Sequence, residues 1–363
     1  MKKVLFVTSY TPSKYSAGQN FTLNLLEDLG RQHSVDVVYF QYRDQEYTPP
    51  SENIRIQKMI PVTIWSRLRN FILCPFFHPI FSIRFSLSTL FFLRSLMNKN
   101  KYDIVCFDFS QVFLYSFFFK TGPVVLIAHD VLFQKFKRQG TLLERGWIYL
   151  TERMIFRQKN IRVYSFSEKD RDLIRQYGQN GSSSVVNFYL SSKILEHDIG
   201  LSVDDFFCFF AAWNRPENHE GLRWFFREVL PHTGKCRFVI LGASMPEDLV
   251  QSIAESESVE YMGFVEDPYA VIARSRALIA PLFKGAGVKV KVIESLACGT
   301  QVIGTSVALE GIPEVTNDSL FECNTSEEFI SVITNFTVIP GHKSTLRKSF
   351  LEFYRDENRR IVL

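Results

Sequence analysis

The chain has few cysteines, and no two of them have the spacing of a zinc site or of a disulfide framework. Single cysteines in apolar runs are typical of reduced core residues. We therefore expect a cytoplasmic protein without structural disulfides. The six residues concerned are Cys74, Cys106, Cys208, Cys236, Cys298 and Cys323.

Long apolar runs are also missing. Within the aromatic-rich residues 64–96, the longest uncharged run, residues 70–83, is broken by Pro75 and Pro79 and is shorter than the roughly 20 apolar residues that span a bilayer. The basic N-terminus continues into an apolar run of only residues 4–7, with Pro12 soon after. This pattern predicts a first buried strand and no export signal.

Signatures of metal and ATP sites are absent too. The seven histidines show no two-ligand helical spacing, and no glycine-lysine phosphate loop occurs. Residues 170–172 form an Asp-x-Asp triplet, but they fall in the first turn of an expected helix that Ser167 caps, where acidic residues favour the helix dipole. We expect no metal ion and no bound cofactor.

What the chain does have is a globular composition with an uneven charge. Its 363 residues are 46% hydrophobic and 22% charged, enough for two domains with separate cores. Residues 1–187 carry 25 Lys and Arg against 14 Asp and Glu, a net charge of +11, whereas residues 188–363 carry 17 against 24, a net charge of −7. The first half is therefore expected to face an anionic surface or substrate. It lacks a nucleic-acid recognition motif, so we favour a membrane leaflet over nucleic acid.

Short apolar runs alternate with longer helical patterns throughout, which predicts parallel α/β layers. We expect strands in the first half at residues 3–8, 35–39, 104–107, 124–128 and 162–166. In the second half we expect them at residues 206–211, 237–241, 259–261, 277–280 and 301–304. The predicted organisation is a first domain at residues 1–187, a linker at 188–203, a second domain at 204–345, and a C-terminal helix at 346–363 that returns to the first domain.

Residues 64–96 mix aromatic and aliphatic residues with arginines. One interpretation is a helix pair packed in the first domain with its arginines at the solvent edge. The other is contact with a membrane surface, with aromatic side chains at headgroup level and arginines near anionic lipid. The sequence leaves both open.

Residues 277–305 carry the clearest chemical signal. They predict a strand, a glycine loop, a helix that Gly299 ends, and a second strand. A glycine loop that leads into a helix N-terminus presents unpaired N–H groups and the positive helix dipole, both of which favour phosphate. Lys289 and Lys291 at the helix start oppose that dipole unless an anion is bound. Glu294 can accept hydrogen bonds from a ribose diol. The two lysines lie on different faces, so we expect at most one to reach the diphosphate.

Several segments in order resemble the C-terminal domain of retaining GT-B glycosyltransferases of the family 4 (group 1) type. These are residues 210–218 (FAAWNRPEN), 221–231 (GLRWFFREVLP), 238–242 (FVILG), 261–267 (YMGFVED) and 285–299 (GAGVKVKVIESLACG). The resemblance covers about 120 residues. It implies two Rossmann-like domains facing a central cleft.

The resemblance also implies a role for each matching residue. Glu294 would bind the donor ribose, and a backbone loop would hold the base. A second loop and its helix would lie against the diphosphate and sugar. The base loop comprises Gly263, Phe264 and Val265; the second comprises Gly285, Ala286, Gly287 and Val288, with Lys291 in its helix.

Two positions depart from the family pattern. Many members carry a Glu on the donor sugar where this chain has Ala286. Many also carry an Arg and a Lys after the first C-terminal strand, where this chain has Trp213 and Asn218. Arg215 or Lys289 could supply the missing charge at the leaving phosphates.

The first half matches the family more weakly. Gly18 stands near a helix start that acceptor or donor phosphate would approach. His129 follows an expected strand and matches a family histidine that faces the donor sugar; the alternative is a histidine satisfied by backbone groups. Asp130 would either orient the ring or cap the next segment.

We expect a metal-independent, retaining glycosyltransferase with His129, Lys289 and Arg215 as its catalytic residues. The donor would be a nucleotide-sugar and the acceptor a lipid-linked or cell-surface glycan, as in bacterial polysaccharide or lipopolysaccharide assembly, with possible peripheral contact at the inner membrane face. Two alternatives remain: a catalytically weak nucleotide-sugar-binding protein, and a GT-B sugar-nucleotide epimerase.

Overall fold

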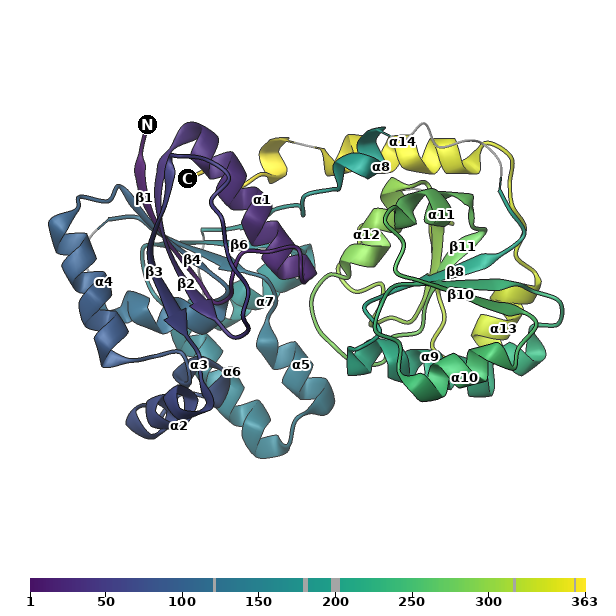
Figure 1. The fold of residues 1–363 in the computed structure, drawn as a ribbon, viewed down its shortest axis with the longest axis horizontal. Coiled ribbons are helices and arrows are strands. Elements are labelled where there is room, and N and C mark those ends of the chain that lie inside the picture. Colours follow the sequence, from purple (N-terminus) through teal and green to yellow (C-terminus); the bar gives the residue numbers. More distant parts are fainter. Residues whose placement is uncertain (120–121, 179–181, 197–202, 316–317, 356) are drawn as a thin grey trace. The chain divides into compact units, whose positions relative to one another are not determined.

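The chain folds into two compact α/β units, each built on one parallel sheet (Figure 1). The computed structural model describes residues 1–119, 122–178, 182–196, 203–315, 318–355 and 357–363. The first unit comprises Met1–Tyr189 together with Arg359–Leu363, and the second comprises Leu190–Asn358. Each unit has its own hydrophobic core.

The first sheet has the strand order β3-β2-β1-β4-β5-β6-β7. Its central strands form because continuous apolar runs can be buried on both faces of a parallel sheet. The bounds are β1 Lys3–Thr8, β2 Ser34–Gln41, β3 Ile54–Pro61, β4 Ile104–Asp108, β5 Val124–Ala128, β6 Ile161–Ser165 and β7 Ser183–Val185.

Helices connect these strands, and side chains cap most of their N-termini. Ser16, for example, accepts a hydrogen bond from the N–H of Gln19 at the start of the first helix. The bounds are α1 Ala17–Gln32, α2 Ile64–Leu73, α3 Pro79–Ser82, α4 Leu87–Lys99, α5 Leu132–Gln139, α6 Leu142–Phe156 and α7 Glu168–Gly178, with a 3₁₀ segment at Ser110–Phe118.

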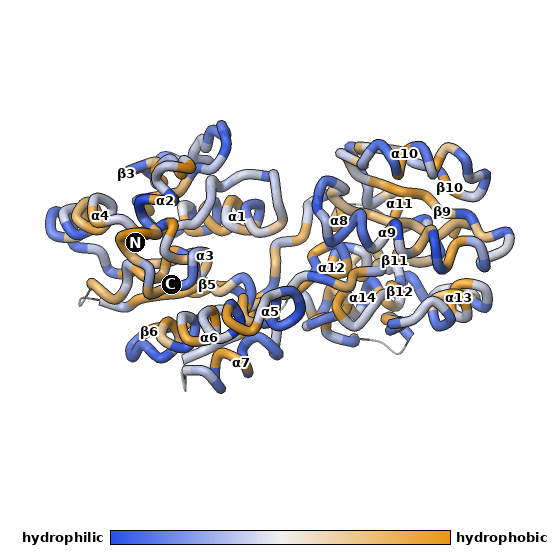
Figure 2. The backbone as a smooth tube through the Cα atoms, turned by 90° about the horizontal axis from the view of Figure 1, so that it is seen from below, coloured by the Kyte–Doolittle hydropathy of each residue, from blue (hydrophilic) through white to orange (hydrophobic). Residues whose placement is uncertain are grey.

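The second sheet has the order β10-β9-β8-β11-β12-β13. Its core is rich in phenylalanine, and Figure 2 shows the hydrophobic strands β9 and β11 inside the more polar helices. The strands are β8 Phe207–Phe210, β9 Phe238–Leu241, β10 Val259–Gly263, β11 Ala277–Ala280, β12 Gln301–Gly304 and β13 Leu320–Glu322. The helices are α8 Ser192–Glu196, α9 Pro216–Glu228, α10 Glu247–Ala254, α11 Pro268–Arg274, α12 Val290–Ala297, α13 Ser326–Thr334 and α14 His342–Tyr354, with short 3₁₀ turns at Leu230–His232 and Glu357–Arg359.

Each sheet has a point at which the direction of strand addition reverses. In the first unit the chain adds β2 and β3 on one side of β1, and then β4 to β7 on the other. In the second unit the reversal lies between β8 and β11. Ligands of open α/β sheets bind outside the carboxyl ends of the strands at such a point. Functional side chains are therefore expected at the carboxyl ends of the strands beside each reversal point.

The boundary between the units falls inside the predicted linker, but part of that segment is helical. Helix α8 belongs to the second unit, where Lys193 donates to the carbonyl of Glu266 and Arg347 donates to the carbonyl of Ile194. Residues 197–202 of the predicted linker lie outside the described residues. The linker is thus shorter than residues 188–203, because α8 has hydrogen-bond partners on the second unit.

The C-terminal segment also differs from the expected single helix at residues 346–363. Helix α14 already begins at His342 and packs against α12 of the second unit, burying Leu346 and Phe350. Only the last residues join the first unit, where Lys2 donates to the carbonyl of Leu363 at 2.7 Å. The apolar face of α14 explains why the helix stays with the second core.

Residues 64–96 form the three helices α2, α3 and α4, where a helix pair was one of the two interpretations. Helix α2 exposes much of its apolar surface: Ile64 and Trp65 are each 80% exposed and Ile72 is 65% exposed. Among the described residues, no helix combines the length and apolar character that a membrane crossing requires.

Candidate functional site

The glycine loop of the second unit lies at the carboxyl end of β11, as the sequence predicted. Gly285 and Gly287 have φ angles of +112° and +69°, a region that side-chain-bearing residues rarely adopt. The loop then enters α12, which begins at Val290 with Lys289 as its N-cap. A loop with this backbone conformation, followed by a helix N-terminus, presents backbone N–H groups that can donate hydrogen bonds to a diphosphate.

Glu294 lies on α12 beside the segment that follows the base loop. Its carboxylate accepts a hydrogen bond from the Tyr269 hydroxyl at 2.8 Å. Burial raises the pKa of Glu294 to about 7, although the bond from Tyr269 opposes the rise. A carboxylate with few partners of its own retains acceptor capacity for a diol.

Lys291 lies one turn before Glu294 on the same helix, so the two side chains share a face. Its Nζ donates to Oδ1 of Asn218 in the first turn of α9, at 3.2 Å. Burial lowers the pKa of Lys291 to about 7, with further lowering by the charges of Lys289 and Arg215. Lys291 thus brings a cation to Asn218, the position where the family pattern has its lysine.

Lys289 and Arg215 stand close enough to act on Lys291, but each is engaged elsewhere. The Lys289 ammonium donates to the carbonyl oxygens of Ala286 and Gly287 in the loop. The Arg215 guanidinium is 2.7 Å from the Glu217 carboxylate and is 58% exposed. The three cations gather at the carboxyl ends of β8 and β11, where the charges of Lys289 and Arg215 lower the pKa of Lys291.

The other positions of the family pattern fall into structural and surface roles. Trp213 is 2% exposed and donates from its indole N–H to the carbonyl of Leu241, so it belongs to the core. In the predicted base loop, Gly263 has a φ of +67°, Phe264 is 78% exposed and Val265 is half-buried. Phe264 is therefore available for contact with a ligand.

The first unit brings together Gly18 and His129, which stand 111 positions apart in the sequence. A Cβ atom on Gly18 would lie 3.3 Å from Nδ1 of His129 and 2.9 Å from Cζ of Phe109. The His129 ring stacks on Phe109, with centroids 3.6 Å apart. Gly18 is thus required for the close approach of α1 to this ring pair.

Asp108, the last residue of β4, orients the His129 ring, a role that the sequence analysis gave to Asp130 as one option. Oδ1 of Asp108 lies 2.7 Å from Nε2 of His129, and the carboxylate is fully buried. Its other oxygen accepts from the hydroxyls of Thr8 and Thr22 at 2.7 and 2.6 Å. Because the carboxylate accepts, Nε2 carries the proton and Nδ1 is the nitrogen on the Gly18 side.

The sequence analysis also offered Asp130 as a cap for the next segment. Helix α5 has Val131 as its N-cap and no side-chain cap. The first N–H groups of α5, those of Leu132 and Phe133, donate to the buried carboxylate of Glu152 on α6 at 2.7 and 2.9 Å. Burial raises the pKa of Glu152 to about 8. In contrast, the predicted Ser167 cap is confirmed, since its hydroxyl oxygen accepts from the N–H of Asp170.

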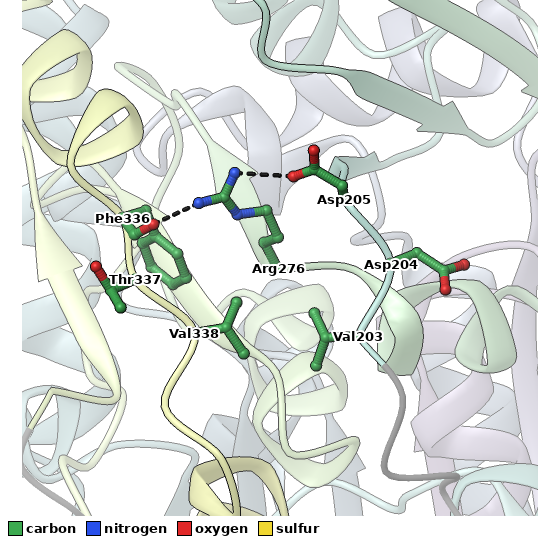
Figure 3. A pocket seen from close by; sticks show the side chains of 7 residues that line it. All are labelled: Val203, Asp204, Asp205, Arg276, Phe336, Thr337 and Val338. Carbon is green, nitrogen blue, oxygen red and sulfur yellow. Dashed lines mark hydrogen bonds and ion pairs between the residues drawn. The ribbon is translucent and has the colours of Figure 1, made fainter.

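An open hollow in the second unit lies at the opposite, amino end of its strands (Figure 3). Arg276 occupies it, donating to Asp205 at 3.0 Å and to the carbonyl of Phe336, while its guanidinium lies 4.9 Å from the ring of Phe207. These contacts hold both terminal nitrogens of the guanidinium and one of its faces. The arrangement ties the sheet to the chain after α13 and is structural.

The described second unit also matches a known family. Residues 205–337 match the model of the family described as glycosyl transferases group 1. No curated protein matches the sequence significantly.

Solved structures resemble the whole chain. Sucrose-phosphate synthase from Thermosynechococcus elongatus is 16% identical, with a TM-score of 0.69 and coverage of 98% of this chain and 94% of that one. WaaG, a glycosyltransferase involved in lipopolysaccharide biosynthesis, is 13% identical, with a TM-score of 0.65 and coverage of 98% and 96%. HepE from Anabaena, solved with UDP and glucose, is 13% identical, with a TM-score of 0.62 and coverage of 98% and 95%. The chain therefore has the GT-B fold of two parallel α/β domains, and its residues 205–337 match the group 1 glycosyl transferases.

Proposed function

We propose that this protein is a retaining glycosyltransferase that moves a sugar from a nucleotide-sugar donor to a lipid-linked or cell-surface glycan. The observation that carries the proposal is the pair formed by Lys291 and Glu294, one turn apart on α12 beside a glycine loop. A carboxylate for a ribose and a cation for a diphosphate on one helix face match the two ends of a nucleoside diphosphate. The family match of residues 205–337 agrees with this assignment.

The relatives in structure suggest which compounds to test first. HepE was solved with UDP and glucose, so UDP and UDP-sugars are the first probes for the donor. WaaG is described as acting in lipopolysaccharide biosynthesis, which favours a surface glycan as acceptor.

In the proposed reaction, the bond between the sugar and the diphosphate breaks on the face that the acceptor hydroxyl attacks. The proton of that hydroxyl passes to the leaving phosphate, and the configuration of the sugar is retained. Lys291, supported by Lys289 and Arg215, would stabilise the charge that develops on the diphosphate. His129, oriented by Asp108, would contact the transferred sugar. We propose that these cations make a divalent ion unnecessary, so that transfer should persist in excess EDTA.

Thermal unfolding with a panel of nucleoside diphosphates tests the donor assignment. A ligand at 100 times its dissociation constant should add about 2.7 kcal/mol of stability, and we expect this shift with UDP first. Transfer of labelled sugar to membrane-derived glycan would then establish the reaction. A protein that no nucleoside diphosphate stabilises would contradict the proposal.

A nucleotide-sugar-binding protein with little catalysis is a second candidate, favoured by Ala286, which offers only backbone where many relatives have a glutamate on the sugar. Mass spectrometry of a labelled donor separates the two functions, since binding without transfer or hydrolysis would exclude the enzyme. An epimerase, the third candidate, would convert the donor sugar without any acceptor.

We also propose peripheral contact between the first unit and an anionic leaflet on the cytoplasmic side. Residues 53–102 contain eight Lys and Arg and no Asp or Glu, and α2 exposes Trp65 and Ile72. Apolar side chains flanked by cations suit an interface with anionic lipid. The intact protein should sediment with anionic vesicles, less so at high salt, and W65S/I72S should weaken sedimentation. Equal sedimentation with neutral vesicles would contradict the charge argument.

A further inference from the structure

A buried arginine without a carboxylate lies at the carboxyl edge of the first sheet. Arg84 follows α3 and is only 4% exposed. Its guanidinium donates to the carbonyl of Ile80 at 2.6 Å and to the hydroxyl of Tyr10 at 3.0 Å, while its Nε has no hydrogen-bond partner. Burying a cation is costly unless an opposite charge accompanies it.

Tyrosine rings surround this cation and connect it to a second one. The Arg84 guanidinium lies 5.1 Å from the ring centroid of Tyr10 and 4.9 Å from that of Tyr42. The guanidinium of Arg67, on α2, lies 5.1 Å from the same Tyr42 ring. Stacking on aromatic faces stabilises a guanidinium but does not neutralise it. The guanidiniums of Arg67 and Arg84 therefore both lie near the ring of Tyr42.

Nothing on the described chain balances these charges. In the described ranges, neither Arg67 nor Arg84 forms an ion pair with a carboxylate. Burial raises the pKa of Tyr42 to about 12, against the effect of both guanidiniums, so its hydroxyl stays neutral at physiological pH. The sequence around the two arginines, residues 53–102, has no acidic residue. The cluster has a net positive charge and an exposed member in Arg67.

The cluster is continuous with the His129 site. Tyr10 and Tyr42 follow β1 and β2, whose carboxyl ends lie side by side in the sheet. Ring centroids are 5.5 Å apart between Tyr42 and Tyr10 and 5.0 Å apart between Tyr10 and Phe109, and Phe109 stacks on His129. A row of rings thus leads from the arginine pair to the histidine at the strand-reversal edge.

We propose that Arg67, Arg84, Tyr10 and Tyr42 form a binding site for a phosphate group carried by the acceptor. A phosphate would supply the counter-charge that the protein lacks, and arginine donors suit its oxygen geometry. The reacting hydroxyl of the same acceptor would lie at the other end of the ring row, toward His129. This inference rests on the proposed transferase function and specifies its acceptor as phosphorylated.

The site can be tested in the intact protein by ¹⁹F NMR after labelling its 14 tyrosines with fluorotyrosine. Y10F and Y42F assign the two resonances. Inorganic phosphate is titrated with UDP present, so that the second unit's anion site is occupied. We expect the Tyr10 and Tyr42 signals to shift together, and R67Q to weaken phosphate binding at least about tenfold, the usual effect of removing a charge-assisted bond.

R69Q is the matched control, because Arg69 lies on the same exposed helix and its guanidinium approaches Asn70 rather than a tyrosine ring. It should leave phosphate affinity within about twofold of the wild-type value, as expected for a distant surface charge screened by salt. Unshifted Tyr10 and Tyr42 signals, or equal losses in R67Q and R69Q, would overturn the proposal. UDP binding is measured separately in each variant, so a failure of the donor assignment is recognised by itself.

Two further titrations identify where the phosphate comes from. A water-soluble sugar phosphate and vesicles that contain a polyprenyl phosphate are compared at equal phosphate concentration. Shifts with the sugar phosphate indicate a soluble acceptor, and shifts only with the vesicles indicate a lipid-linked one. In either case R67Q should raise the KM for that acceptor while hydrolysis of the donor by water continues.

Discussion

Replacing Lys291 with methionine is expected to lower the rate of sugar transfer by about 10²–10³-fold, the usual loss when one preorganised group that stabilises transition-state charge is removed. Lys291 reaches Asn218 at the start of α9, and burial together with the charges of Lys289 and Arg215 lowers its pKa to about 7. A desolvated ammonium among other cations gains most when negative charge develops beside it. Single-turnover transfer with a saturating donor measures the effect.

The same change should stabilise the folded protein. The pKa of Lys291 is about 7 when folded and 10.5 ordinarily. Between these two pH values Lys291 is protonated in the unfolded chain but not in the folded chain, so its contribution makes the free energy of unfolding rise with pH. Below about pH 7 the lysine is charged in both states, and the folded protein bears the full cost of burying that charge. Methionine removes the buried charge. We therefore expect Tm at neutral pH to rise while transfer falls.

Lys284→Met is the control for this variant. Lys284 lies in the same loop region but is exposed and pairs with Glu220 at 2.6 Å, so its loss should change transfer little. A drop in both Tm and activity for Lys291→Met would mean that the lysine holds the fold together. That result would contradict its assignment to the diphosphate.

The strands that were predicted to the residue have one property in common. β1, β5, β11 and β12 have continuous apolar interiors and are bounded by polar or turn residues, so the sequence itself marks their limits. The strands that were missed are edge strands. β3 mixes apolar with polar residues and ends at Pro61, while β7 and β13 have only three residues each. Their formation depends on a neighbouring strand, which a local pattern does not contain.

The site residues also separate into those that a local pattern predicts and those that depend on distant parts of the chain. Glu294, Lys291 and the glycine loop lie within ten residues, so one local pattern predicts them together. Asp108 was missed because it appears only as the polar end of an apolar strand. Its partners Thr8, Thr22 and His129 are 100, 86 and 21 positions away. A residue whose role depends on such distant partners becomes visible only after the sheet is assembled.

Replacing Glu294 with glutamine is expected to weaken binding of the donor nucleotide by about 1–3 kcal/mol, the range for hydrogen bonds to a charged group. The carboxylate can accept from both ribose hydroxyls, whereas an amide offers one acceptor oxygen and a competing NH₂ donor. Tyr269, which donates to Oε1 of Glu294, still finds an acceptor in glutamine. The fold should persist, and calorimetric titration with the preferred nucleotide-sugar measures the loss.

The dependence of donor affinity on pH gives the sharper test of both residues. Burial raises the pKa of Glu294 to about 7 and lowers that of Lys291 to about 7. Below this pH Glu294 gains a proton and loses acceptor capacity; above it Lys291 loses its proton and its charge. Wild-type affinity should therefore peak near pH 7 and fall on both sides. A nucleotide-sugar is the proper ligand, because a terminal phosphate would itself titrate near pH 6.

Each variant should then remove one side of that profile. Glu294→Gln has no carboxyl group to protonate, so its affinity should stay level below pH 7 and still fall above it. Lys291→Met should show the reverse. If both variants kept the full bell shape, other groups would be responsible, and the assignment of ribose to Glu294 and diphosphate to Lys291 would be wrong. Two opposite, single-sided profiles would instead require both residues to contact one ligand, as expected from their positions one turn apart on α12.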